Sequence, residues 1–115
     1  MYIEKEFVDK IHWFLKEIRK RNVNIENKRN LYNIITTLKS RTDNQRRRFA
    51  LYYGLAINEN KALSLTEIAK LDNCSVPAVR SSIVRIRNTI PMIKGIEKER
   101  ILQIIKDMEE GKLWC

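Results

Sequence analysis

The stretch SLTEIAKLDNCSVPAVRSSIVRIRNTI, residues 64–90, predicts a short helix, a tight turn and a longer helix. Ser64 and Glu67 have the spacing of a capping box, in which each side chain bonds the backbone NH of the other residue. Ser75 is suited to cap the second helix, and Pro77 falls in its first turn, where a missing NH does no harm. This order of elements is typical of a helix-turn-helix.

The apolar residues of this stretch divide each predicted helix into an inner and an outer face. Ala69 is small, as two helices that cross steeply over a short turn require, and the turn itself is expected at Asp72, Asn73 and Cys74. The inner faces are expected to carry Leu65, Ile68, Ala69, Val79, Ile83, Ile86 and Ile90. That pattern leaves on or beside the outer face of the second helix Arg80, Ser81, Val84, Arg85 and Arg87. Its three cations suit a phosphate backbone.

The rest of the chain also has a helical apolar period, without the sustained alternation of a half-buried strand. We therefore expect an all-α helical bundle. The first helix is expected over residues 3–20, with inner residues Ile3, Phe7, Ile11, Phe14, Leu15 and Ile18. After an interruption at residues 22–27, the second is expected over residues 28–40, with inner residues Leu31, Ile34, Ile35 and Leu38.

A third helix is expected to open at a capping box formed by Thr42 and Gln45 and to stop at Gly54. A polar loop, residues 55–63, then leads into the helix-turn-helix. Pro91 and Gly95 punctuate the chain after it, and a last helix ending near Gly111 is marked by Ile101, Ile104, Ile105 and Met108.

Charge points to a polyanionic partner. The 115 residues include 23 Lys and Arg against 14 Asp and Glu, a net charge of +9, and 43% hydrophobic content indicates a folded domain. Residues 1–40 carry nine basic and five acidic groups, residues 41–95 ten and four, and residues 96–115 four and five. The excess therefore lies in and before the helix-turn-helix, where release of counterions from DNA or RNA would favour binding.

These observations divide the chain into three segments. Residues 1–40 form amphipathic helices for dimerisation or packing, residues 41–95 hold the helix-turn-helix, and residues 96–115 form a C-terminal helix.

Two stretches resemble the fourth region of bacterial sigma factors, which binds the −35 promoter element and touches the flap of RNA polymerase. RRRFALYYGL, residues 46–55, is similar to the family's arginine-containing helix that ends in an aromatic, a glycine and a leucine. EIAKLDNCSVPAVRSSIVRIRNTI, residues 67–90, follows the family pattern without gaps. The resemblance covers about 40% of the chain and implies binding of duplex DNA in the major groove.

The chain departs from the family at three positions. Asp72 stands where an apolar residue is usual, Asn73 where glycine is frequent, and Ser82 where an arginine is common. Residues 1–40 do not resemble the region with which sigma factors melt promoters. The resemblance therefore implies a small sigma-like regulator, as in phages and mobile elements, or one half of a split sigma factor.

Carried over position by position, the resemblance assigns the base-reading end of the recognition helix to Val76, Pro77, Ala78, Arg80 and Ser81. An arginine can read guanine through two hydrogen bonds, and small apolar side chains can touch thymine methyl groups. Phosphate contacts fall to Ser75, Arg85 and Arg87. Ser82 is counted with the DNA-binding residues, although the loss of the family's arginine there is expected to weaken a phosphate contact. Arg46, Arg47 and Arg48 are expected either to reach flanking phosphates or an acidic protein, or to form a solvated helix face.

Other classes of function find little support in the residues. Cys74 and Cys115 lack the paired spacing of zinc ligands, and His12 is the only histidine, so we expect neither a metal nor a cofactor. Nothing in the local sequence activates a nucleophile, and we expect no enzymatic activity. The chain has no apolar run of membrane-spanning length and no signal-peptide pattern, so a cytoplasmic location is expected.

The leading hypothesis is thus a transcription regulator of sigma region four type that binds double-stranded DNA and has RNA polymerase as a further candidate partner. An alternative is a module that docks on RNA polymerase or another regulator with little DNA contact. A third is a component of a mobile-element packaging or recombination complex. Whether the protein forms a homodimer is left open.

Overall fold

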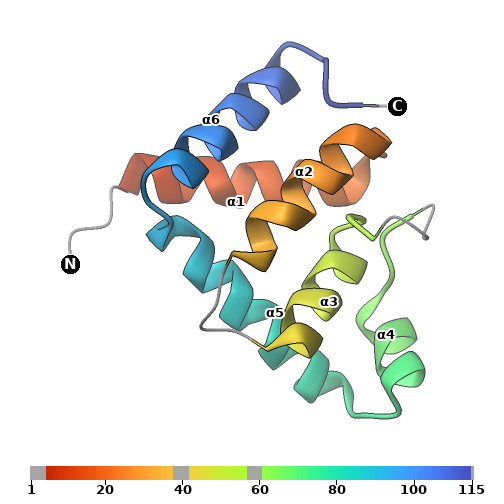
Figure 1. Cartoon of the computed structure of the whole chain (residues 1–115). Helices are drawn as coiled ribbons and strands as arrows, with labels where there is room; N and C mark the ends of the chain where they lie inside the picture. Colours follow the sequence, from red (N-terminus) through yellow and green to blue (C-terminus); the bar gives the residue numbers. More distant parts are fainter. Residues whose placement is uncertain (1–4, 38–41, 57–60, 115) are drawn as a thin grey trace.

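The computed structural model describes residues 5–37, 42–56 and 61–114, and within these ranges the regular structure is helical (Figure 1). The elements in chain order are α1 (Lys5–Lys20), α2 (Ile25–Thr36), α3 (Asp43–Tyr52), α4 (Leu65–Asp72), α5 (Val76–Thr89), the 3-10 helix η1 (Ile90–Met92) and α6 (Ile96–Glu109). The expected all-α class is confirmed. The only extended pairing in the described residues is an isolated bridge between Val23 and Trp114.

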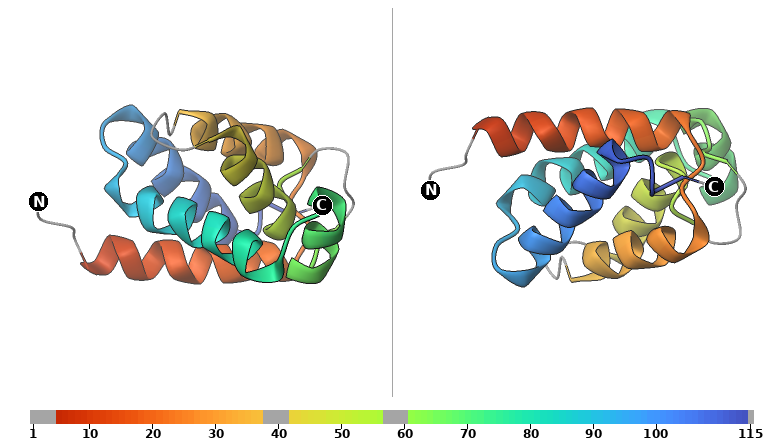
Figure 2. Two further views of the ribbon diagram at one scale, coloured as in Figure 1. Left: turned by 90° about the horizontal axis from the view of Figure 1, so that it is seen from below. Right: turned by 90° about the horizontal axis from the view of Figure 1, so that it is seen from above.

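Helix α5 connects α3 and α4 with the 3-10 helix η1 and, through it, with α1. It packs against α3 and α4 and continues into η1, against which α1 packs. Helices α2 and α6 contact each other, and α2 also contacts α3. In both views of Figure 2, α1 lies along one side of the molecule and α2 along the opposite side. The molecule is flattened, with extents of 36 × 36 × 20 Å.

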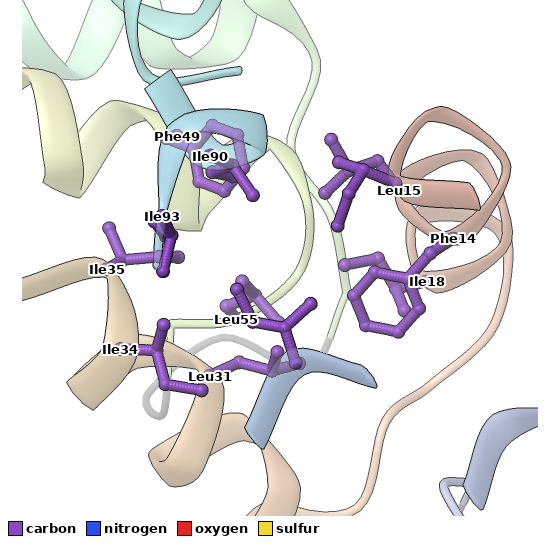
Figure 3. Close-up of a pocket in the computed structure, with 12 residues that line it drawn as sticks. Phe14, Leu15, Ile18, Leu31, Ile34, Ile35, Phe49, Leu55, Ile90 and Ile93 are labelled. Atoms are coloured by element: carbon purple, nitrogen blue, oxygen red, sulfur yellow. The ribbon is translucent and has the colours of Figure 1, made fainter. Parts of the chain in front are cut away.

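One hydrophobic core serves all three sequence segments. Phe49 of α3, Ile86 of α5 and Leu113 after α6 are each fully buried and belong to the same cluster as Ile11 of α1. Inside it is a cavity of about 20 Å³ with an entirely apolar lining, toward which side chains of α1, α2 and η1 point (Figure 3). Because the lining offers a water no hydrogen-bond partner, the cavity is expected to stay dry.

The first predicted helix is confirmed over its described part. Its inner side chains Phe7, Ile11, Phe14, Leu15 and Ile18 are buried, and Ile3 lies outside the described residues. The third is confirmed with its capping box, in which the Thr42 hydroxyl accepts from the Gln45 NH and the Gln45 side chain accepts from the Thr42 NH. Gly54 follows it with a φ of 73°, in the left-handed region, as expected.

The predicted start of the second helix at residue 28 is wrong. Helix α2 begins at Ile25, because the Asn24 side chain accepts a hydrogen bond of 2.9 Å from the Asn27 backbone NH and so caps the helix three residues earlier. Lys28 therefore lies in the second turn and is buried. The expected inner residues Leu31, Ile34 and Ile35 are buried, whereas Leu38 lies outside the described residues.

The last predicted helix corresponds to α6, and Gly111 after it has a φ of 78°. The chain then returns to the link between α1 and α2. The Asn24 NH donates to the Leu113 carbonyl at 2.9 Å, and the Asn24 side chain donates to the Lys112 carbonyl at 3.2 Å. The Arg21 guanidinium stacks 3.9 Å from the centre of the Trp114 ring. Residues far apart in sequence thus close this end of the molecule.

Candidate nucleic-acid interface

Local hydrogen bonds build α4 and the turn after it. The Ser64 hydroxyl accepts from the Glu67 NH and the Glu67 carboxylate accepts from the Ser64 NH, each at 3.1 Å. These bonds to Ser64 lower the pKa of Glu67. Asn73 adopts a φ of 50°, in the left-handed region that asparagine tolerates. The Cys74 NH then bonds the Ala69 carbonyl at 3.0 Å, which closes the turn.

Helix α5 begins and packs as its sequence predicts. The Ser75 hydroxyl accepts a 3.2 Å hydrogen bond from the Ala78 NH, and Pro77 occupies the first turn. The expected inner residues Val79, Ile83, Ile86 and Ile90 are buried, and Ala69 of α4 is buried beneath them. One correction concerns Asp72, which was expected in the turn and is instead the last residue of α4.

The outer face of α5 carries two arginines without a partner. Arg80 and Arg85 are exposed, and within the described parts of the chain neither forms an ion pair or a hydrogen bond through its side chain. At about 100° per residue, Pro77, Ser81, Val84 and Asn88 form the line farthest from the core. Arg80 and Arg85 lie on opposite flanks of that line. The face thus presents a narrow, largely uncharged centre between two cations.

Arg87 lies on the same flank as Arg80 but closer to the protein. Its side chain is partly buried, and its Nη1 lies 3.4 Å from the Tyr53 hydroxyl, a weak hydrogen bond. Arg87 is therefore less available to an external phosphate than Arg80 or Arg85.

The arginines of α3 are directed to a carboxylate within the chain. Arg47 binds Asp72 through both terminal nitrogens, at 3.0 and 2.7 Å, and the Arg48 Nε donates to the same carboxylate at 2.6 Å. Hydrogen bonding from Arg47 holds the pKa of Asp72 below its ordinary value, and the same contact raises the pKa of Arg47. Arg46 pairs with Asp43 one turn earlier. The alternative expectation, a solvated helix face, fits Arg47, which is exposed, but not Arg46 or Arg48, which are largely covered.

The expected placement of Ser82 on the phosphate-facing side is wrong. Its side chain is buried, because the hydroxyl donates to the Ala78 carbonyl at 3.1 Å and accepts from the Arg48 Nη1 at 3.0 Å. Arg48 therefore links the end of α4 at Asp72 to the middle of α5 at Ser82. We call Asp72, Arg47, Arg48 and Ser82 the Asp72 network.

The connection from Asp72 through Arg48 to Ser82 was not predicted from the sequence, although Asp72 and Ser82 were each noted. Asp72 and Ser82 were identified as two separate departures from the sigma pattern, whereas Arg48 contacts both. The two departures are an acidic residue at position 72 and a serine in place of an arginine at position 82. In the structure Arg48 forms hydrogen bonds with both side chains. Asn88, exposed on the outer line of α5, was also not singled out.

The described residues include no group of three or more His, Cys, Asp and Glu side chains that could hold a metal ion. Cys74 is a partly buried free thiol, and Cys115 lies outside the described ranges. Among the helices of the described ranges, none combines the length and the apolar character needed to cross a bilayer.

Scans of the chain against protein-family models, curated proteins and solved structures find no match.

Proposed function

We propose that this protein is a DNA-binding transcription regulator whose helix α5 enters the major groove of duplex DNA. The observation that carries the proposal is the contrast on one helix between a buried apolar face and an outer face on which Arg80 and Arg85 are exposed and find no partner among the described residues. A basic outer face on the second helix of a helix-turn-helix is the usual arrangement for DNA recognition. The net charge of +9 adds a favourable field for a polyanion.

The residues divide into those that read bases and those that hold phosphates. Arg80 and Ser81 lie in the first half of α5, where hydrogen-bonding side chains reach base edges. Val76 and Ala78 are partly exposed and offer small apolar contacts to thymine methyl groups. Arg85 and the capped start of the helix at Ser75 hold phosphates. With so few base-reading groups, DNA shape contributes to the choice of site.

The resemblance to sigma region four narrows the proposal to promoter DNA near the −35 position, with RNA polymerase as the protein partner. The departures at Asp72 and Ser82 are compatible with this fold, because the Asp72 network joins them.

The decisive experiment is selection of bound fragments from the source genome, followed by binding of the enriched duplex over a range of salt concentrations. We expect fragments clustered at −35-like positions and an affinity that falls steeply as salt rises. Arg80→Ala should weaken the selected site by about 1–3 kcal/mol. Arg85→Ala should weaken all duplexes alike and lower the salt slope by about one.

Unaltered affinity in both variants would show that α5 is not the DNA-binding helix. Capture of RNA polymerase by a protein that gives no salt-dependent DNA binding would instead favour the alternative, a module that docks on the polymerase. Enrichment of sites unrelated to promoters would favour a packaging or recombination role.

A further inference from the structure

A polar groove of about 430 Å³ runs between α2 and α6, away from the outer face of α5. Asn27, Asn30 and Asn33 line one wall, and the opposite wall is formed by side chains of α6. The two helices run in opposite directions, since the start of α2 is hydrogen-bonded to the segment that follows α6 (Figure 1). Nothing in the proposed DNA contact uses these residues.

The floor of the groove is apolar and its walls are rich in amides. Ile34 and Ile104 are buried at the floor. In the described structure the side chains of Asn30 and Asn33 have no hydrogen-bond partner, and Gln103 bonds only Asp107, at 3.0 Å. An amide side chain carries both a donor and an acceptor. Several such groups beside an apolar floor suit a ligand that itself alternates donors and acceptors.

The groove also has one charge of each sign. Arg100 lies toward the start of α6 and Asp107 lies toward its end. Their seven-residue separation corresponds to about 10.5 Å along the helix at about 1.5 Å per residue. Arg100 has no ion pair in the described part of the chain. These charges cancel, so the groove is neutral on a protein of net charge +9.

These features favour a peptide over the two other classes of occupant. A nucleic acid would gain more from the basic faces of the protein than from a neutral groove. A second copy related by a two-fold axis would place one hollow against the same hollow, which leaves a void between the copies. A single extended chain is narrow enough to enter, and its backbone groups are free to bond amide side chains.

We propose that the groove between α2 and α6 binds an extended peptide that carries an acidic and a basic side chain three residues apart. In a polyproline II conformation the chain rises about 3.1 Å per residue with three residues per turn, so such side chains share a face about 9 Å apart. The acidic side chain pairs with Arg100 and the basic one with Asp107. Asn30 and Asn33 bond the peptide backbone, which in this conformation has no internal hydrogen bonds.

The test uses the full chain and an array of acetylated, amidated octapeptides. One set carries Glu-x-x-Lys with Ala, Pro, Ser or Leu at x, and matched sets carry Glu-x-Lys, Glu-x-x-Glu and Lys-x-x-Lys. We expect the first set to bind best and its strongest member to shift the side-chain amide NMR signals of Asn30, Asn33 and Gln103. Arg100→Ala should weaken that peptide about tenfold, whereas Arg29→Ala, an exposed arginine on the same molecule, should leave its affinity unchanged.

The Asn30→Ala and Asn33→Ala variants provide a second arm, because both residues are exposed and their loss should not affect folding. Each should weaken the peptide while leaving DNA binding by α5 unchanged. Binding that ignores the spacing of the two charges, or signal shifts away from the groove, would overturn the proposal. So would oligonucleotide-induced shifts of the same amides, or a dimer whose interface contains them.

Discussion

Arginines on α3 and on α5 lie on two helices that pack against each other, and they have different surroundings. Arg47 and Arg48 of α3 converge on Asp72, whose side chain is only 9% exposed. Arg80 and Arg85 of α5 have no acidic partner in the described residues and face solvent. One pair therefore links α3 to α4 and α5 through hydrogen bonds, and the other remains available to a ligand. A count of positive charges does not separate these roles, because it omits the position of Asp72.

The largest effect on stability is expected from Asp72→Ala. It removes three charge-assisted hydrogen bonds, and we expect the free energy of unfolding in urea to fall by about 2 kcal/mol. This expected loss already allows for screening by solvent around Arg47, because its side chain is 44% exposed. Asp43→Ala is the matched control, since its carboxylate is 97% exposed and should contribute little. Equal losses in the two variants would contradict a structural role for the Asp72 network.

Affinity for DNA should depend on the arginines of α5 and little on those of α3, the reverse of what is expected for stability. Arg85→Gln should lower the affinity for duplex DNA about tenfold, about 1.4 kcal/mol, whereas Arg47→Gln should lower it less than about twofold. The physical reason is that the Arg47 guanidinium is already paired with the Asp72 carboxylate. Titration by fluorescence anisotropy at two salt concentrations measures both. A loss with Arg47→Gln as large as with Arg85→Gln would mean that Arg47 exchanges Asp72 for a phosphate.

The adjacent serines of α5 offer a finer comparison. Ser82→Ala removes a buried hydroxyl bonded to Arg48 and should cost about 1 kcal/mol of stability without changing the DNA contact. Ser81→Ala changes an exposed side chain and should leave the melting temperature unaltered while weakening the selected DNA site a few-fold. Thermal unfolding and DNA titration of both variants provide the measurements. If both serines behave alike, the assigned orientation of α5 is wrong.

The contribution of Asp72 to stability is also expected to depend on acid. Because the folded-state pKa of Asp72 is lowered, its contribution is fully present above the ordinary carboxyl pKa of about 3.9 and is lost as the pH falls through the lowered value. The stability difference between the wild type and Asp72→Ala should therefore be constant above about pH 5 and shrink below about pH 4. Urea unfolding at several pH values checks this. A difference that stays constant down to pH 2 would assign the stabilisation to packing rather than to charge.

The segment from α4 to α5 was the most predictable part of the molecule. Ser64, Ser75 and the stripe from Val79 to Ile90 are local signals, and each lies where its sequence pattern predicts. The Asp72 network was not predictable in the same way, because it joins residues 24 to 34 positions apart. Their proximity follows from how α3 packs on α4 and α5, which local periodicity does not encode.

The start of α2 and the groove beside it were also not predictable from the local sequence pattern. Asn24 caps α2, whereas the sequence pattern had predicted an interruption over residues 22–27. The amides on α2 were unremarkable as a sequence, because the wall that faces them is supplied by α6. The sequence could indicate the helix that is proposed to contact DNA, but not a groove formed by two distant segments.

The bonds between Asn24 and residues 112–113 have a consequence for how the chain folds. During synthesis the link between α1 and α2 cannot form these bonds until residues 112–113 have left the ribosome, about 90 positions after Asn24. Contacts of such large sequence separation carry a high loop-closure cost and slow folding. The segment from α4 to α5, whose hydrogen bonds are mostly local, is therefore expected to form first. The nascent protein would then hold a formed α5 before its N-terminal and C-terminal helices are locked together.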